Sequence, residues 1–398
     1  MGIRIKKPTW NTILNLAFII AYFVPSYIIN QMPFLYALLR GIRYISVFYC
    51  MYIFLVKKPP VNRTVLMIFL FYFYDIAMTF FGRGVMSVAI TYFLSYVPIA
   101  IIIDYNMRKD SESCLAELSF VCIVWLLINA LSWNPDGLFD TSYGRAFFLG
   151  IRTRAIDVAL PAMIFSMLYS VLQLQRKRKL KAIVAPLLVI IPFFWFSYVE
   201  NVSNGIICSI LMILLLLFGE RIDANKLKWV YVATIILNIV IVFFRVQNLF
   251  QWLIVDILGE SLSLSNRTFI WDGAILRWMQ SISTILFGNG IGIRDSFYVS
   301  DMGNAHNQYL QFLVDGGCMK LGLYFAMIFL SIKKIRNAER SKLASIALGG
   351  LCIISIIMLS ECCCETAYFP VVLVVLYHVD NLTLYEFNRV EVKSNGVG

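Results

Sequence analysis

Long apolar stretches recur along almost the whole sequence, and they restrict its possible folds more than any other feature. Hydrophobic residues make up 60% of the 398 residues and charged residues only 14%. A soluble domain has roughly 45–50% apolar and 25% charged residues, and about twenty apolar residues cross a bilayer as a helix. The composition therefore excludes a soluble enzyme, a disordered chain and a nucleic-acid-binding module, and it predicts a polytopic membrane protein.

Twelve stretches are apolar enough to be predicted as membrane spans. They predict an all-α bundle of about 12 transmembrane helices, forming a single transmembrane domain over residues 1–398. The first stretch contains Pro25 and lacks a small-residue cleavage site, so we expect a retained helix and not a signal peptide. The predicted spans are 11–29, 34–56, 64–81, 85–103, 114–131, 155–175, 182–200, 202–218, 228–246, 306–332, 343–360 and 366–380.

Basic residues are distributed unevenly between the predicted loops. The formal net charge is +11, and basic clusters occur at 176–181 and 333–342. With the N-terminus inside, the inner segments hold 23 Lys and Arg residues and the outer segments hold 7. Because loops rich in Lys and Arg stay in the cytoplasm, this split predicts that both termini are cytoplasmic. We interpret the excess positive charge as a determinant of topology.

Two segments on the predicted outer side are too long to be simple connections. They are 132–154 and 247–305, the second of about 59 residues. Within the second, Ser265 is placed to cap a helix over about 266–283. Residues near helical spacing follow it: Phe269, Ile270, Ala274, Trp278 and Ile282. We expect a large, partly helical extracytoplasmic loop whose helix lies on the outer membrane surface, with its aromatic face toward the membrane.

Ionisable residues in or beside the predicted spans gather toward the outer side. They include Arg40, Arg43, Asp75, Asp157, Glu200, Arg245, His306, Asp315, Glu361 and Glu365. Charges inside a membrane are costly and indicate function, so together these residues predict a wet, charged cavity open to the outside. His306 begins the tenth predicted span. A histidine at that position is suited to take a proton from an attacking hydroxyl.

The sequence predicts neither a metal nor another cofactor. Two distant histidines cannot form a His-rich site, and no Asp-x-Asp pair occurs. The nine cysteines show no metal-ligand spacing, and we interpret them as apolar filling. Gly288-Asn289-Gly290-Ile291-Gly292 follows no βαβ pattern, so we predict a tight turn there and not a nucleotide-binding loop.

These motifs together resemble the O-antigen polymerase and ligase superfamily, the Wzy-like and WaaL-like integral membrane glycosyltransferases. Asp315 and Gly317 follow His306 by nine and eleven residues, as in the family pattern. The specific part of the resemblance covers about 60 residues. The matching motifs are Ser265-Asn266-Arg267-Thr268-Phe269-Ile270-Trp271, Phe287-Gly288-Asn289-Gly290, His306-Asn307 and Tyr309-Leu310.

Two positions depart from the family pattern. Lys320 stands where the family often has a second glycine, and Ser203-Asn204-Gly205 lacks an expected arginine. The resemblance therefore implies that one phosphate contact comes from another arginine. The replacements we consider are Arg152, Arg154 and Arg245.

The resemblance implies metal-independent transfer of a glycan from an undecaprenyl-diphosphate carrier to an acceptor sugar hydroxyl, outside the bacterial cytoplasmic membrane. Arg267 would bind the diphosphate, because fixed positive charge stabilises that leaving group, and His306 would act on the hydroxyl. The remaining expected substrate-binding residues are Arg277, Asn307 and Tyr309. Expected partners are the lipid-linked oligosaccharide, membrane lipid, a chain-length regulator and a flippase, but no nucleic acid.

Several functions remain open at this point. A polymerase of O-antigen or capsule repeats is favoured over a ligase that transfers the glycan to lipid A–core in lipopolysaccharide biosynthesis. The alternative from another class is a flippase for lipid-linked oligosaccharides or another transporter. Transporters often contain internal repeats and broken helices, and neither is recognisable in the sequence. A scaffold or sensor without catalysis is the third alternative.

Overall fold

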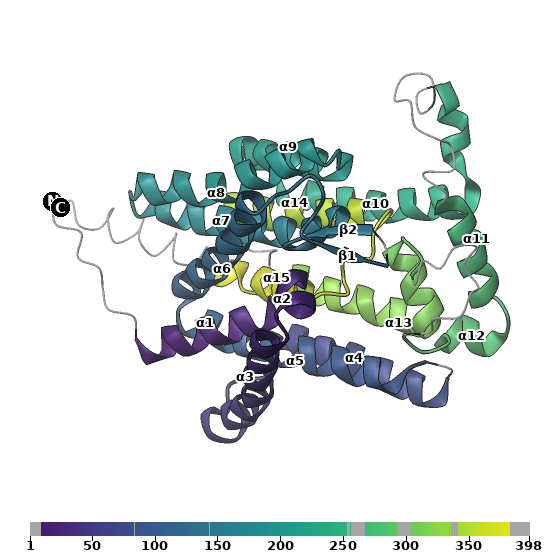
Figure 1. Ribbon diagram of the computed structural model, residues 1–398, viewed down its shortest axis with the longest axis horizontal. Coiled ribbons are helices and arrows are strands. Elements are labelled where there is room, and N and C mark those ends of the chain that lie inside the picture. The colour runs from purple at the N-terminus through teal and green to yellow at the C-terminus, as the bar shows by residue number, and fades with distance from the viewer. Residues whose placement is uncertain are drawn as a thin grey trace. The chain divides into compact units, whose positions relative to one another are not determined.

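Helices dominate the computed structural model, which describes residues 9–82, 84–142, 144–252, 255, 267–292, 304–333, 335 and 341–382 (Figure 1). Within these ranges, nine helices are long and apolar enough to cross a membrane. The protein is therefore an all-α polytopic membrane protein in its main architecture, as predicted. The 247–305 loop is described only in part, and Ser265 lies outside the described residues.

Each of the twelve predicted spans contains a helix. Three of these helices are shorter than the others: α1 (Trp10–Tyr22), α14 (Lys342–Ile357) and α15 (Tyr368–Tyr377). A helix of ten residues rises about 15 Å, half of the roughly 30 Å hydrocarbon core. The count of twelve complete spans therefore stays a prediction.

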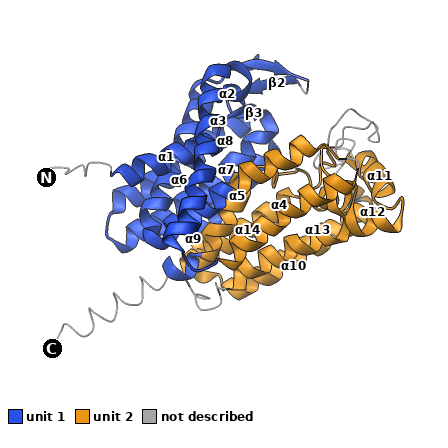
Figure 2. Ribbon diagram, turned by 90° about the horizontal axis from the view of Figure 1, so that it is seen from below, with its two compact units in different colours: residues 1–61, 98–217, 378–398 blue, residues 62–97, 218–377 orange. Residues whose placement is uncertain are grey.

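The chain divides into two compact units (Figure 2). Unit 1 contains residues 1–61, 98–217 and 378–398, and unit 2 contains residues 62–97 and 218–377. The helix α5 (Met86–Lys109) contributes to both units, and the division falls at Pro98. The prediction of a single transmembrane domain stays a prediction, and we describe each unit by itself.

Unit 1 is built around α7 (Ala155–Gln175), in which almost every residue is buried. The helices α6 (Ser111–Leu131) and α8 (Lys179–Val199) pack against α7. The other helical elements of the unit are α1, α2 (Ser26–Gln31), α3 (Pro33–Tyr52) with a π-helical extension (Ile53–Lys57), the part of α5 from Pro98 on, a 3-10 turn (Arg152–Arg154) and α9 (Ser203–Phe218).

The first predicted span, 11–29, is not one helix. α1 ends at Tyr22 and α2 begins at Ser26, with Pro25 as the N-cap residue of α2. Proline has no backbone N–H and disfavours a helical conformation in the residue before it. The prediction of a continuous helix there was wrong for this reason.

The segment 132–154 contains a small antiparallel sheet that the all-α prediction did not include. Its strands are β1 (Phe139–Thr141), β2 (Gly144–Phe147) and β3 (Gly150–Ile151), in the order β1-β2-β3. Asp140 pairs with Arg145, and Phe147 pairs with Gly150.

Unit 2 is built around α13 (Gln308–Lys333), against which four helices pack. These are α4 (Arg63–Phe81), α11 (Arg267–Trp278), α12 (Ile282–Phe287) and α15. A second pair is formed by α10 (Ala224–Phe244) and α14. Two 3-10 turns, Gly219–Arg221 and Val246–Phe250, flank α10 in the sequence.

The helix predicted over 266–283 is two helices. α11 ends at Trp278, and the Ser281 side chain forms a capping box with Thr284 that starts α12. Of the predicted face, Ile270 and Ala274 are buried, whereas Phe269 and Ile282 are 55% and 78% exposed. The buried face contacts α13, and its orientation toward a membrane stays a prediction.

A break divides α13 into two halves. Gly317 has φ 63° and ψ −163°, far from helical values, while the residues around it are helical. A Cβ atom at Gly317 would lie 2.4 Å from the backbone of Leu286, so only glycine fits where α12 approaches. No broken helix was recognisable in the sequence, and the prediction that there is none was therefore wrong.

Candidate functional site

His306 lies directly before α13, in a left-handed backbone conformation with φ 45°. Its N–H donates to Asn304 Oδ1 at 2.9 Å, and Asn307 Oδ1 accepts from the N–H of Leu310 at 2.9 Å. Asn307 thus satisfies an N–H of the first turn. The predicted stripe of His306 with Tyr309, Leu310, Leu313 and Gly317 on one helix was wrong, because His306 precedes the helix and Gly317 breaks it.

The two predicted catalytic residues meet at a third residue, Glu361. Arg267 Nη2 donates to Glu361 Oε1 at 3.1 Å, and His306 Nδ1 lies 3.9 Å from Glu361 Oε2. Glu361 is buried, with 6% of its surface exposed. The sequence identified Glu361 only as one of several acids on the predicted outer side, and its distance along the chain from Arg267 concealed the pairing.

Packing explains why α11 brings Arg267 to this position. Trp271 and Ala274 of α11 are fully buried in a cluster with Leu310 and Val314 of α13. This cluster holds α11 against the first half of α13, the half that His306 directly precedes. Arg267 is the first residue of α11. This apolar contact therefore holds the beginning of α11 near the beginning of α13.

Arg245 lies beside the first turn of α11. It ends α10 in a left-handed conformation with φ 54°, a usual helix C-terminus. Its Nη2 donates to the carbonyl oxygen of Thr268 at 3.0 Å and to the carboxylate of Asp272, and its guanidinium lies 5.3 Å from the Trp271 ring centroid. Arg245 is thus next to the residue that follows Arg267.

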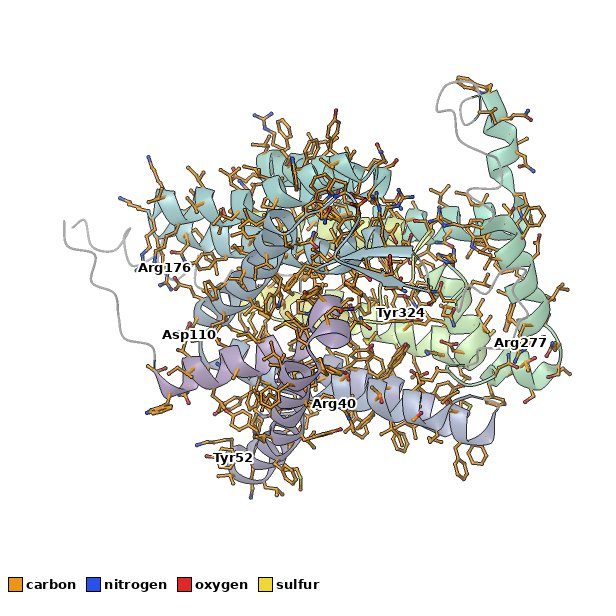
Figure 3. The ribbon with its side chains drawn as sticks, in the orientation of Figure 1. Arg40, Tyr52, Asp110, Arg176, Arg277 and Tyr324 are labelled. Atoms are coloured by element: carbon orange, nitrogen blue, oxygen red, sulfur yellow. The ribbon has the colours of Figure 1, made fainter. Side chains whose placement is uncertain are left out.

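Arg277, which Figure 3 labels, lies near the end of α11, whereas Arg267 is its first residue. Arg277 is buried, with 6% of its surface exposed. Ten residues of helix separate it from Arg267, a rise of about 15 Å. A substrate contact for Arg277 stays a prediction.

Asn307 and Tyr309 join helices of unit 2. Asn307 is fully buried, and its Nδ2 donates to Asn238 Oδ1 at 2.9 Å and to the Leu359 carbonyl oxygen at 3.2 Å. Tyr309 Oη is hydrogen-bonded to Ser355 Oγ at 2.7 Å. These contacts connect α13 with α10 and α14, and a substrate contact for either residue stays a prediction.

Arg152 and Arg154 belong to unit 1, where both side chains bind oxygen atoms of neighbouring residues. Arg152 Nη1 donates to the carbonyl oxygen of Glu200 at 3.2 Å, and Arg154 Nη1 lies 3.2 Å from Asp157 Oδ2. The buried Glu200 carboxylate also pairs with Arg145 at 2.9 Å. The predicted site residues are therefore divided between the units, with six of eight in unit 2.

Sequence reasoning missed a buried ion cluster at the break in α13. Lys320 Nζ lies 2.6 Å from Asp75 Oδ1 and 3.4 Å from Asp315 Oδ2, and all three residues are less than 10% exposed. Gln311 Nε2 donates to Asp315 Oδ1 at 2.7 Å. Lys320 appeared in the sequence only as a departure from a family glycine. The signal for the cluster was charge inside two apolar stretches.

The glycine-rich turn after α12 binds the end of the first half of α13. The N–H groups of Asn289 and Gly290 donate to the carbonyl oxygens of Val314 and Asp315 at 2.9 and 2.8 Å. Tyr74 Oη donates to the Gly316 carbonyl oxygen at 2.9 Å. The break leaves these carbonyls without helical partners, and the turn supplies donors. The predicted tight turn is confirmed, with φ 75° at Gly288.

Within the described ranges, no three His, Cys, Asp or Glu side chains are placed to hold a metal ion. No protein-family model matches the sequence, and no curated protein matches it. A functional conclusion therefore depends on the chemistry of Arg267, Glu361 and His306 and of the residues around them.

Proposed function

We propose that the protein is an integral membrane glycosyltransferase that uses an undecaprenyl-diphosphate-linked glycan as donor. It transfers the glycan to an acceptor sugar hydroxyl on the outer face of the bacterial cytoplasmic membrane. In this proposal the chain has twelve spans and two cytoplasmic termini. We favour a polymerase of O-antigen or capsule repeats, with the lipid A–core ligase as the alternative.

The observation that supports the proposal best is the shared contact of Arg267 and His306 with Glu361. A guanidinium suits a diphosphate leaving group, and an imidazole suits an acceptor hydroxyl. Glycosyl transfer from a lipid diphosphate needs both groups near the same carbon atom. Arg267 and His306, 39 positions apart in the sequence, both approach the carboxylate of Glu361. The helices around them are long and apolar enough to cross a membrane.

We infer an order of events from this geometry. Glu361 pairs with Arg267 at 3.1 Å. A diphosphate that binds Arg267 competes with Glu361, whose carboxylate is then available to His306, now 3.9 Å away. A carboxylate that accepts a hydrogen bond from Nδ1–H orients the imidazole and leaves Nε2 as the base. In this scheme the donor itself completes the base.

In the reaction, the acceptor oxygen bonds to the anomeric carbon while the bond from that carbon to the diphosphate oxygen breaks. The hydroxyl proton goes to His306, and the lipid diphosphate leaves with the electron pair. Arg267 stabilises the charge that develops on the diphosphate. Of the three arginines considered as a second phosphate contact, we assign this role to Arg245, because it contacts Thr268 beside Arg267.

A second function is favoured by a separate observation, the broken helix α13 with its buried Lys320 between two aspartates. Discontinuous helices and buried charges are typical of transporters. The second candidate is therefore a flippase for lipid-linked oligosaccharides. It requires movement of the intact donor across the bilayer, whereas a glycosyltransferase forms a new glycosidic bond.

Purified protein in proteoliposomes with a defined undecaprenyl-diphosphate oligosaccharide separates the two functions. A glycosyltransferase produces longer glycans on the lipid, in excess chelator, and loses this activity in the Arg267→Lys variant. Donor that crosses the bilayer without a new glycosidic bond would establish the transporter and refute the transferase. Addition of a purified lipid A–core acceptor distinguishes a ligase from a polymerase.

A further inference from the structure

An arginine of unit 1 is exposed in the first half of a membrane-length helix. Arg40 is exposed on α3, which with its π-helical extension forms a 25-residue apolar helix, Pro33–Lys57. Arg40 is seven residues from the start of α3, a depth of about 10 Å along the axis. A charged side chain this far into a lipid-facing helix is costly unless it has an anionic partner.

Two tyrosines, one turn before and one turn after, hold the Arg40 guanidinium in place. Its centre lies 5.8 Å from the Tyr36 ring centroid, and its Nη2 donates to Tyr44 Oη at 3.3 Å. Residues four apart on a helix lie on the same face. The guanidinium is therefore held on the exposed face of α3, where Tyr44 is 51% exposed.

The neighbouring Arg43 is held differently, although its guanidinium also lies 6.0 Å from the Tyr36 ring centroid. Arg43 Nε donates to the Ala21 carbonyl oxygen at 2.5 Å, and its guanidinium lies 5.6 Å from the Tyr22 ring centroid. Arg43 thus joins α3 to α1 inside unit 1. The two arginines are on one helix, but Arg43 contacts the neighbouring helix α1, whereas Arg40 is exposed and contacts Tyr36 and Tyr44 of its own helix.

An apolar track continues along α3 from the Arg40 position toward Tyr52, which Figure 3 labels on the same helix. Its main side chains are Phe48, Met51 and Leu55, which are 70%, 54% and 67% exposed. A positive group with an apolar strip below it matches a lipid with an anionic head and acyl chains. Tyrosines beside the head are typical of the membrane interface.

We propose that the Arg40 face of α3, formed by Tyr36, Arg40, Tyr44 and Phe48, binds an anionic membrane phospholipid through its phosphate. The guanidinium contacts the phosphate oxygens with its planar fork, and the acyl chains lie along Phe48 and Met51. This site is in unit 1 and does not depend on the proposed glycosyl transfer.

Native mass spectrometry of the purified chain with dioleoylphosphatidylglycerol tests the proposal. The control lipid is a galactolipid with the same acyl chains and no phosphate. We expect tighter retention of the phosphatidylglycerol, and a loss of affinity by roughly fivefold or more in Arg40→Gln. Arg40→Lys should lose affinity too, because a lysine is a point charge, and Tyr44→Phe should lose less. Circular dichroism verifies that each variant is folded.

Arg221→Gln is a matched control, because Arg221 also lies over an aromatic ring, Phe218 at 5.9 Å, but at the end of a helical segment. It should bind the lipid like the parent. Equal binding by Arg40→Gln, or by the galactolipid, would overturn the proposal. Full affinity in Arg40→Lys would also overturn it, since nonspecific attraction between a positive charge and the phosphate would then explain the binding. A change in oligomeric mass without a change in bound lipid would assign the face to a second copy of the chain instead.

Discussion

The left-handed backbone of His306 is unusual for a residue that carries a β-carbon. For such residues this conformation costs roughly 1–2 kcal/mol, and asparagine tolerates it better than most. Conformations of this kind persist where the surroundings enforce them, often at functional sites. At His306 the neighbouring Asn304 and Asn307 fix the turn with their side chains. The backbone thus directs the imidazole independently of any helix.

This conformation makes His306→Asn the sharpest test of the base. Asparagine retains the left-handed turn but has no imidazole, so the protein should unfold at the parent's temperature while turnover falls roughly 10²–10⁴-fold. His306→Ala should show a similar loss of turnover with a somewhat lower unfolding temperature. Near-normal turnover in His306→Asn would remove His306 from the mechanism, whatever the family.

Glu361→Gln should affect donor binding and turnover in opposite directions. If the carboxylate competes with the donor for Arg267, its neutralisation tightens donor binding by a few fold. Turnover should fall at least tenfold, because the imidazole loses its orienting partner. Glu365→Gln, in the same turn, is the control and should change neither quantity. Weaker donor binding in Glu361→Gln would contradict competition at Arg267.

At the scale of elements, hydropathy located every helix-containing span but not the break in α13. Gly317 and Gly322 occur in the same apolar stretch, and only Gly317 breaks the helix. The difference comes from the backbone of α12, which lies 2.4 Å from a Cβ atom at Gly317 and is absent within 4 Å of one at Gly322. Local sequence cannot contain this information, because the determining residues are about thirty positions away.

Alanine substitutions at these two glycines should therefore have different effects on the free energy of unfolding. Gly317→Ala should destabilise the protein by roughly 2–4 kcal/mol, through both left-handed strain and overpacking. Gly322→Ala should be neutral or stabilising by about 0.5–1 kcal/mol, as for an open helical site. Thermal unfolding in one detergent measures both. Equal unfolding temperatures would mean that the contact between α12 and α13 is not formed in the protein.

The ion cluster at this break makes a second prediction for the elements α4 and α13. Lys320→Met leaves Asp75 and Asp315 buried without their cation, and removal of one partner from a buried pair costs about 3–5 kcal/mol. Asp315→Asn should lower the free energy of unfolding clearly less, because the ion pair between Lys320 and Asp75, at 2.6 Å, remains. The ranking is measurable by thermal unfolding. Asp315→Asn as damaging as Lys320→Met would show that the Lys320–Asp75 pair alone does not stabilise the buried charges.

At the scale of the whole molecule, the charge pattern predicts a topology but does not identify the site. The basic loop 176–181 and the sheet-containing segment 132–154 are predicted on opposite sides of the membrane. The sheet itself escaped prediction, since strands of two to four residues are too short to show alternation. Likewise, the sequence does not predict that Arg267 and Glu361 pair, because they are 94 positions apart and meet only in the folded protein. Sequence therefore identifies the charged residues, and folding selects which of them meet.

Single cysteines test the topology in a background without the nine native thiols. Ser142→Cys, exposed in 132–154, should react with an impermeant maleimide in intact cells. Lys181→Cys, exposed in the first turn of α8, should react only after permeabilisation. The reverse pattern would invert the orientation, and it would place the proposed chemistry on the cytoplasmic side.

The contact between the turn 288–290 and α13 is made by backbone groups on both sides. Hydrogen bonds between N–H and C=O groups are indifferent to the side chains around them. The contact constrains the glycines that permit the approach and Asn289, whose Nδ2 donates to the Val314 carbonyl oxygen at 3.3 Å. It places few demands on the other side chains of the turn. A family built on such a junction would preserve its shape through extensive divergence. Relatives of this protein are then better sought by comparing backbone structures than by comparing amino-acid sequences.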